Sequence, residues 1–162
     1  MIDSAHLPEA AIANTHATKA NPCIWTNATQ AGGLILVVDD DKVLVKLVST
    51  MLQKEGFRVI TAPDVATAVR NVGRAHPLLI LLDINLPDGT GLDVLRQIRK
   101  LITGRIPVIA MSSTCTASVA EAAGEAGAAA FFAKPLNFDE LWPTMNRLLG
   151  NDVTFIESAA AR

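Results

Sequence analysis

The hydrophobic positions of this chain follow two alternating patterns between residues 34 and 150. Short, nearly continuous apolar runs are typical of strands covered on both faces. Between them lie longer segments in which apolar residues recur every three to four positions, as in helices with one buried face. The alternation predicts a doubly wound α/β domain, with a five-stranded parallel sheet and helices on both faces.

The apolar runs place the strands at 34–38, 57–61, 78–82, 107–111 and 129–133. The helical segments are 41–56, 64–75, 91–102, 117–127 and 137–149. The second strand is the least apolar of the five, which favours a position near the edge of the sheet.

Local signals mark several helix ends. Gly56 is expected at the C-cap of the first helix and Asp64 at the N-cap of the second. Thr90 and Asp93 have the spacing of a capping box. Pro143 lies inside the last helix, where its ring removes a backbone donor, so that helix is expected to kink there or to start late.

The two ends of the chain differ from this regular region. Residues 1–33 are rich in Ala, Thr and Asn and end in two glycines, which predicts a flexible N-terminal tail. Ile24-Trp25 is its one apolar pair, which could be a docking segment but is more simply interpreted as an incidental contact with the domain. Residues 151–162 are interpreted as a short C-terminal tail, too short for an output domain.

Composition excludes several classes of protein. The chain has 162 residues, half of them hydrophobic, which suits one core. No apolar run approaches the length of a membrane span, and no secretion signal is evident. A net charge of −2 argues against bulk nucleic-acid binding. Cys23 and Cys115 lack metal-type spacing and are interpreted as reduced thiols of a cytoplasmic protein.

Polar residues end four of the five predicted strands. Asp39 and Asp40 follow the first strand and Asp83 follows the third. Ser112 follows the fourth and Lys134 the fifth. Because ligand sites of open α/β sheets form beyond the carboxyl ends of the strands, we expect these side chains to converge there.

The chemistry of this set suits phosphoryl transfer. Oxygen ligands without sulfur favour a hard cation such as Mg²⁺, which would offset the repulsion between neighbouring carboxylates. An aspartate can accept a phosphoryl group covalently. Lys134 and Ser112 could donate hydrogen bonds to its oxygens.

Blander interpretations compete with this one. Asp39 and Asp40 could cap the first helix, a role to which Asp41 is also suited. Ser112 could be an ordinary hydroxyl at a strand end, and Lys134 a solvated surface charge. The combination of acids and lysine at one sheet edge favours the functional interpretation.

Four segments together resemble the response-regulator receiver domain of two-component signalling. They are VVDDD, LLDINLPDGTGLDVL, PVIAMSS and FFAKPL, and the resemblance covers residues 34 to about 150. It implies the flavodoxin-like strand order 2-1-3-4-5.

The resemblance also implies roles for individual residues. Asp83 would accept the phosphoryl group. Mg²⁺ would be bound by Asp40, by Asp39 mostly through water, by Asp83 and by the backbone carbonyl of Asn85. Thr114 and Asn85 occupy positions that tune dephosphorylation in the family.

The other implied roles concern the last two strands. Ser112 would bond the phosphoryl group and Lys134 would pair with it. Pro135 would follow a cis peptide bond. Phe131 matches the aromatic switch position, although core packing explains a phenylalanine there equally well.

The leading functional hypothesis is a stand-alone receiver that is not a conventional enzyme. It would take phosphate from a histidine kinase or phosphotransfer protein and signal to a downstream protein through the face formed by 117–127, 129–133 and 137–149. Homodimerisation on phosphorylation is a further expectation.

Two alternatives stay open. Asp88-Gly89-Thr90 echoes the nucleophile loop of haloacid-dehalogenase-type phosphatases, but Asn85 stands where that loop needs a second carboxylate. The other alternative is a receiver-like adaptor that works without phosphate, which the intact acid set disfavours.

Overall fold

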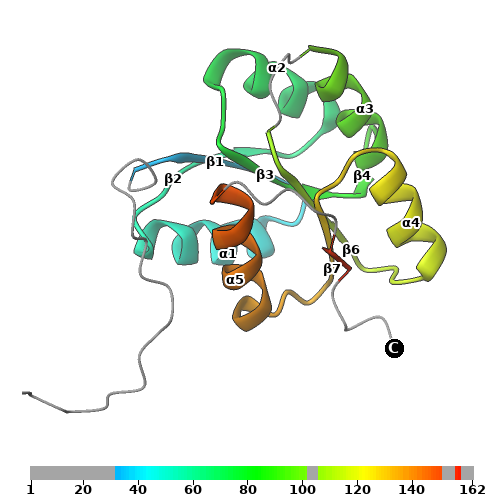
Figure 1. Ribbon diagram of the computed structural model, residues 1–162. Coiled ribbons are helices and arrows are strands. Elements are labelled where there is room, and N and C mark those ends of the chain that lie inside the picture. Colours follow the sequence, from blue (N-terminus) through cyan, green and yellow to red (C-terminus); the bar gives the residue numbers. More distant parts are fainter. Residues whose placement is uncertain (1–31, 102–105, 151–155, 158–162) are drawn as a thin grey trace, which may run out of the picture.

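A computed structural model describes residues 32–101, 106–150 and 156–157 (Figure 1). Predictions for residues 1–31, including Cys23 and Ile24-Trp25, lie outside the described residues, as does most of 151–162. The main strands are β1 (Leu34–Val38), β2 (Arg58–Ala62), β3 (Leu79–Asp83), β6 (Val108–Ser112) and β7 (Ala130–Ala133). The helices are α1 (Lys42–Lys54), α2 (Val65–Ala75), α3 (Gly91–Leu101), α4 (Ala117–Glu125) and α5 (Phe138–Leu149).

These five strands form a parallel sheet in the order β2-β1-β3-β6-β7, which confirms the predicted fold and strand order. Two further pairings were not predicted. β8 (Ile156–Glu157) adds a sixth, parallel strand beside β7, and β4 (Asn85–Leu86) pairs with β5 (Gly89–Thr90) in a separate antiparallel hairpin. Elements of two residues are too short to produce a hydrophobic period, which is why the sequence pattern does not reveal them.

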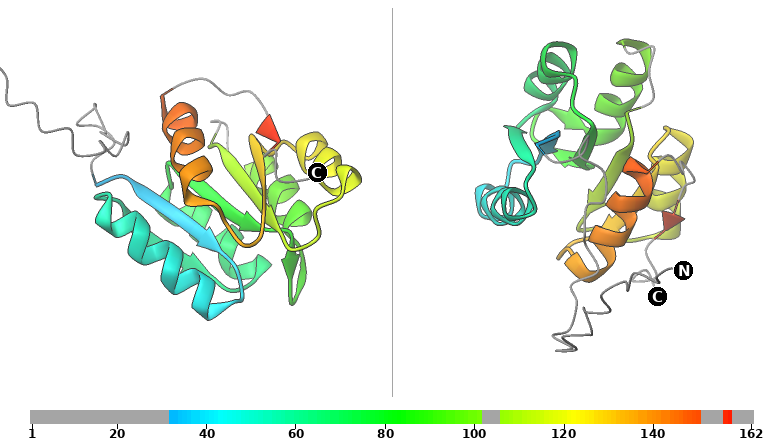
Figure 2. Two further views of the ribbon diagram at one scale, coloured as in Figure 1. Left: turned by 90° about the horizontal axis from the view of Figure 1, so that it is seen from below. Right: turned by 60° about the vertical axis from the view of Figure 1, so that its left-hand side comes forward.

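Helices cover both faces of the sheet (Figure 2), and a layer of buried hydrophobic side chains lies between the sheet and the helices on each face. Alternate strand residues point to opposite faces. Val37 therefore packs with buried residues of α1 and α5, and its neighbour Leu36 packs with buried residues of α2, α3 and α4. Because helices and apolar side chains cover both faces of the sheet, polar groups gather beyond the carboxyl ends of the strands.

Short-range hydrogen bonds set the helix ends as predicted. Asp64 is the N-cap of α2, where its side chain accepts a hydrogen bond from the Thr67 amide. Thr90 and Asp93 exchange hydrogen bonds in front of α3. Gly56 follows the C-cap of α1 with a φ of +89°, a left-handed conformation that suits glycine.

Helix α5 contains Pro143 and does not start late. Asn137 is its N-cap, so the proline lies beyond the first turn. The hydroxyl of Thr144 donates to the Glu140 carbonyl at 3.0 Å, which adds a side-chain bond within the turn that contains the proline. Burial of Leu141 and Met145 against the sheet supports the helix on either side of Pro143. In the described part of the chain, no helix is long and apolar enough to span a membrane.

Candidate functional site

Three carboxylates meet at the carboxyl edge of the neighbouring strands β1 and β3. Asp39 directly follows β1, and Asp83 is the last residue of β3. Both are almost fully buried, whereas Asp40 is exposed. Oxygen atoms from the three side chains lie within 4.8 Å of one another. The structure therefore brings together acids that are more than 40 residues apart in sequence.

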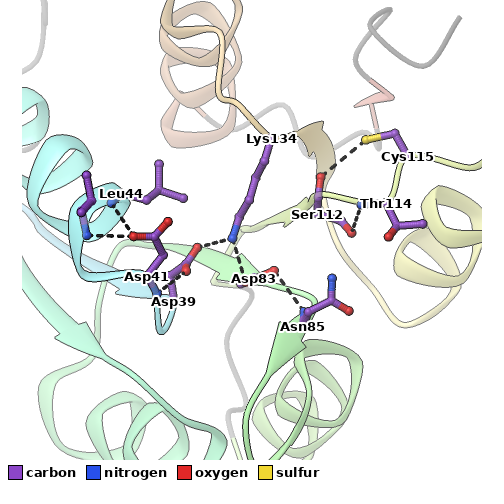
Figure 3. Close-up of polar contacts among 10 residues, drawn as sticks. Asp39, Asp41, Leu44, Asp83, Asn85, Ser112, Thr114, Cys115 and Lys134 are labelled. Atoms are coloured by element: carbon purple, nitrogen blue, oxygen red, sulfur yellow. Dashed lines mark hydrogen bonds and ion pairs between the residues drawn. The ribbon is translucent and has the colours of Figure 1, made fainter.

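Lys134 reaches this cluster from the end of β7 (Figure 3). Its Nζ donates a hydrogen bond to Asp83 Oδ2 at 2.7 Å and lies 2.6 Å from Asp39 Oδ2. The Lys134 amide donates to the Ser112 carbonyl at 2.8 Å, which ties the backbone of the lysine to the neighbouring strand β6. One ammonium thus bridges two buried carboxylates.

The pKa values of the bridge reflect the balance between burial and charge. Burial raises the pKa of Asp39 above its usual 3.8, and the Lys134 ammonium offsets only part of that effect. Burial alone would lower the pKa of Lys134, but the two carboxylates together outweigh it and raise the pKa above 10.5. The lysine is therefore firmly charged, whereas Asp39 is ionised at a cost that a second cation would reduce.

The charge balance of the cluster indicates that the site suits a cation. Asp39 Oδ2 is paired with the Lys134 ammonium at 2.6 Å, and the same ammonium pairs with Asp83. One ammonium thus accompanies three clustered carboxylates, so a second cation would reduce the repulsion between them. An all-oxygen donor set suits Mg²⁺. Asp39, Asp40 and Asp83, with the carbonyl of Asn85, are the residues that could hold it.

Capping of α1 does not account for the acids. Asp41 is the N-cap, and its Oδ1 accepts hydrogen bonds from the amides of Val43 and Leu44 at 2.8 and 3.2 Å. Asp39 Oδ1 instead accepts from the Asp41 amide at 2.9 Å, which orients the Asp39 carboxylate from within its own loop. The capping interpretation of Asp39 and Asp40 is therefore wrong.

Ser112 and Asn85 are both close to Asp83, Ser112 from the neighbouring strand β6 and Asn85 from the loop after β3. Met111 is the partner of Asp83 in the sheet register, and Ser112 follows it as the last residue of β6. The buried Ser112 hydroxyl accepts a hydrogen bond from the Thr114 amide at 3.0 Å. The Asn85 amide donates to Asp83 Oδ1 at 3.0 Å, so Asp83 is held through both of its oxygens.

The remaining candidates lie on and after β7. Phe131 is 1 % exposed and packs in the hydrophobic layer beneath α2, α3 and α4. The peptide bond between Lys134 and Pro135 is cis. The aromatic ring therefore belongs to the core in this structure, while the lysine projects into the acid cluster.

A shallow cavity of about 250 Å³ borders the acids. It lies beside the start of α1 and the end of β2, and its lining includes Asp40, Lys42 and Thr61. The exposed Asp40 faces this opening, so the cluster can be reached from solvent although its other two acids are buried.

Sequence reasoning missed two residues that shape the site. A side chain at Gly91 would collide with the backbone carbonyl of Asp83, because the Gly91 amide hydrogen-bonds to the Ile84 carbonyl. Asp88 was interpreted as part of a turn, but its carboxylate also binds the amides at the start of α2. A glycine at the first position of a predicted helix is a weak signal for such a close approach, and nothing in the sequence indicates the partner of Asp88.

Comparisons with known proteins agree with this geometry. A family model described as the response regulator receiver domain matches residues 35–146. The probable transcriptional regulatory protein TcrX of Mycobacterium tuberculosis is 35 % identical over 78 % of this chain and 54 % of its own length. The sporulation initiation phosphotransferase F of Bacillus subtilis is 31 % identical over 71 % of this chain and 92 % of its own length.

Solved structures give the same result. A receiver domain of a sensor histidine kinase from Pseudomonas aeruginosa, with magnesium coordinated in its active-site cleft, is 34 % identical. It matches with a TM-score of 0.69, over 75 % of this chain and 100 % of that one. The chain spans about half the length of the first transcriptional regulators that it matches.

Proposed function

The chain belongs to the response regulator receiver domain family, and from that premise we propose that Asp83 accepts a phosphoryl group in a Mg²⁺-dependent reaction. The observation that carries the proposal is the position of the Asp83 carboxylate. It is buried at the end of β3, 2.7 Å from the Lys134 ammonium, with carboxylate oxygens of Asp39 and Asp40 within 4.8 Å. The acceptor carboxylate therefore lies beside one cationic group, Lys134, and beside two carboxylates that could hold a second cation.

In the proposed reaction, an oxygen of Asp83 attacks the phosphorus of a phosphohistidine and forms an acyl phosphate. The bond from phosphorus to the donor nitrogen breaks, and the imidazole keeps the electron pair and takes a proton from water. Asp39, Asp40, Asp83 and the Asn85 carbonyl would hold the Mg²⁺ ion, which would supply positive charge to the phosphoryl oxygens. A sensor histidine kinase or a phosphotransfer protein is the proposed donor.

Lys134 and Ser112 are proposed to bind the phosphoryl group after transfer. Lys134 already contacts the acceptor carboxylate, so its ammonium needs little movement to pair with a phosphoryl oxygen. The Ser112 hydroxyl lies at the end of the adjacent strand and would donate to a second oxygen. Movement of Ser112 would then be passed to Phe131 on the paired strand β7 as the proposed switch.

The proposed output surface consists of α4, β7 and α5. Lys134 follows β7 directly, so a change at the site reaches this surface through one strand. A downstream protein, or a second copy of the phosphorylated chain, would bind there. These partners are proposals, because the chain spans about half of its first regulatory relatives.

Incubation with acetyl phosphate and Mg²⁺, followed by intact-mass measurement, tests the proposal. We expect the mass increase of one phosphoryl group in the wild-type protein and none in Asp83→Asn. Asp139→Asn, an exposed aspartate of α5, is the matched control and should be phosphorylated like the wild type.

Other outcomes would favour the alternatives. No mass increase with any donor would support a phosphate-independent adaptor. Repeated turnover of a small phosphoester would support a phosphohydrolase, although Asp88 binds the start of α2 and not the acid cluster. A mass increase that persists in Asp83→Asn would contradict the assignment of the acceptor.

A further inference from the structure

Asp88 joins the loop after the phosphoacceptor strand to a helix on the other side of the site. Its Oδ1 accepts a hydrogen bond from the Val65 amide at 2.8 Å, and its Oδ2 accepts one from the Ala66 amide at 3.3 Å. These are the first two residues of α2. The first amides of a helix have no partner within the helix, so Asp88 acts as a cap supplied from a distant part of the chain.

Helix α2 also has a cap of its own. Asp64, which directly precedes it, accepts a hydrogen bond from the Thr67 amide at 2.6 Å. The two carboxylates therefore satisfy different amides of one helix terminus. If either carboxylate is removed, the other still caps α2. The hydrogen bonds of Asp88 therefore also serve to hold the segment that contains Asp88 against α2.

That segment is the hairpin of β4 and β5, which has only two residue pairs and mostly exposed side chains. A hairpin of this size has little stability of its own. Its base is fixed next to β3, because the Gly91 amide donates to the Ile84 carbonyl at 2.8 Å. Its tip is held against α2 by Asp88.

The hairpin begins with a residue of the proposed site. The Asn85 amide donates to Asp83 Oδ1 at 3.0 Å, and the Asn85 carbonyl is a proposed Mg²⁺ ligand. A tip that is released from α2 can rotate about the hairpin base and carry Asn85 with it. Mg²⁺ requires nearly ideal octahedral geometry, so a small displacement of one ligand lowers its affinity.

From this geometry we propose that Asp88 is a positioning residue, which ties the β4–β5 hairpin to α2 and so holds Asn85 and Asp83 in place for the cation and the phosphoryl group. Asp88 does not touch the reacting atoms. Its action passes along the two intervening residues of the hairpin, Leu86 and Pro87, to Asn85. The inference rests on the proposed function, since it concerns the same site.

The test compares Asp88→Ala with Asp64→Ala in the full chain. Each variant removes one negative charge and one cap from the same end of α2. Only Asp88 is itself part of the hairpin, at its tip. Mg²⁺ affinity is measured by calorimetric titration. We expect Asp88→Ala to weaken Mg²⁺ binding roughly tenfold or more, as for other residues that orient metal ligands, and Asp64→Ala to change it less than about twofold.

A second variant and a second measurement separate positioning from folding. Asp88→Asn keeps one acceptor oxygen, so its Mg²⁺ affinity should lie between those of the wild type and Asp88→Ala. Amide hydrogen exchange without Mg²⁺ should become faster at Val65 and Asn85 in Asp88→Ala. In Asp64→Ala the faster exchange should stay at Thr67 and the rest of the first turn.

The outcomes distinguish the inference from the function on which it rests. Equal losses of Mg²⁺ affinity in Asp88→Ala and Asp64→Ala would reduce Asp88 to a cap and overturn the inference alone. So would unchanged exchange at Asn85. A wild-type protein that binds no Mg²⁺ and gains no phosphoryl group would overturn the proposed function and the inference together.

Discussion

The Lys134 ammonium lies 2.7 Å from the Asp83 carboxylate, although the two residues are 51 positions apart in sequence. The same ammonium lies 2.6 Å from Asp39, whose side chain is fully buried. Two carboxylates so close together would repel each other in a buried site. Lys134 therefore provides the positive charge that allows both to remain ionised in the absence of a metal.

Replacement of Lys134 by Met should destabilise the protein by about 3 kcal/mol at pH 7, because it leaves two buried carboxylates without their cation. In the wild type the pKa of Lys134 is raised, so its contribution is complete below pH 10.5 and is lost as the pH rises through the folded pKa. The deficit of the variant should shrink as the pH falls and Asp39, whose pKa is raised by burial, takes up a proton. Urea denaturation at pH 7 and pH 4.5 measures this, with Lys134→Arg as the charge-conserving control.

Asp39→Asn should stabilise the protein while it weakens Mg²⁺ binding. The folded pKa of Asp39 is raised by burial, so its ionised form opposes folding. Below the unfolded pKa of 3.8 this residue is protonated in both states; as the pH rises through the folded pKa, the wild type loses stability that Asn retains. We expect a gain of about 1 kcal/mol at pH 7, a usual size for removal of a functional charge.

The gain should decrease toward pH 4 in urea denaturation, and saturating Mg²⁺ should stabilise the wild type more than the variant. A variant that is less stable than the wild type at pH 7 would show that the ion pair with Lys134 outweighs the burial of Asp39. The direction of the pH dependence separates these two effects. If the burial of Asp39 dominates, the wild type loses stability relative to the variant as the pH rises above 3.8; if the ion pair dominates, the wild type gains stability.

Gly91→Ala should destabilise the protein by about 3 kcal/mol and impair phosphorylation of Asp83. The added Cβ would collide with the backbone carbonyl of Asp83, which is not the end of a flexible side chain and cannot move aside cheaply. The control is Gly73→Ala in α2, where a Cβ meets no atom within 4 Å. That change should raise stability by about 0.5–1 kcal/mol. Thermal denaturation and intact mass measure both properties.

The backbone pairing of β8 predicts protection of the β7 edge. Ala130 and Phe131 of β7 are the register partners of Ile156 and Glu157 of β8. Successive residues of a strand direct their backbone groups to opposite sides, so one of these two β7 amides faces β8. Glu157→Pro disrupts the pairing of β8 and should speed amide exchange at that β7 residue roughly tenfold, equivalent to about one lost hydrogen bond. Glu157→Gln removes the same charge but keeps the donor, and should leave the exchange unchanged. Equal rates in both variants would contradict a stable pairing.

The features that the sequence predicted are those with short-range causes. Asp64 caps the helix that begins at the next residue, and Thr90 bonds to Asp93 within one turn, so each pair is visible in a short stretch of sequence. Four of the main strands were predicted because both of their faces are buried, which leaves continuous apolar runs. The less apolar β2 was predicted near an edge, and it is the edge strand next to β1. The convergence of Asp39, Asp83 and Lys134 followed from one further rule, that parallel strands end at the same edge of a sheet.

The features that the sequence did not predict depend on contacts between distant segments. Asp88 belongs to a turn, as expected. Its two hydrogen bonds to α2 form because the first residues of α2 lie beside the tip of the hairpin in space. β8 depends on a free edge of β7, and two residues carry no period of their own.

The order of apolar and polar residues was therefore sufficient to specify the five main strands, the five helices and the edge of the sheet at which the acids and the lysine gather. It could not specify how those groups share charge and hydrogen bonds. The bridge of Lys134 between two buried acids arises from packing at atomic distances. The energy of buried charges depends on separations of a few ångströms, which no sequence pattern records.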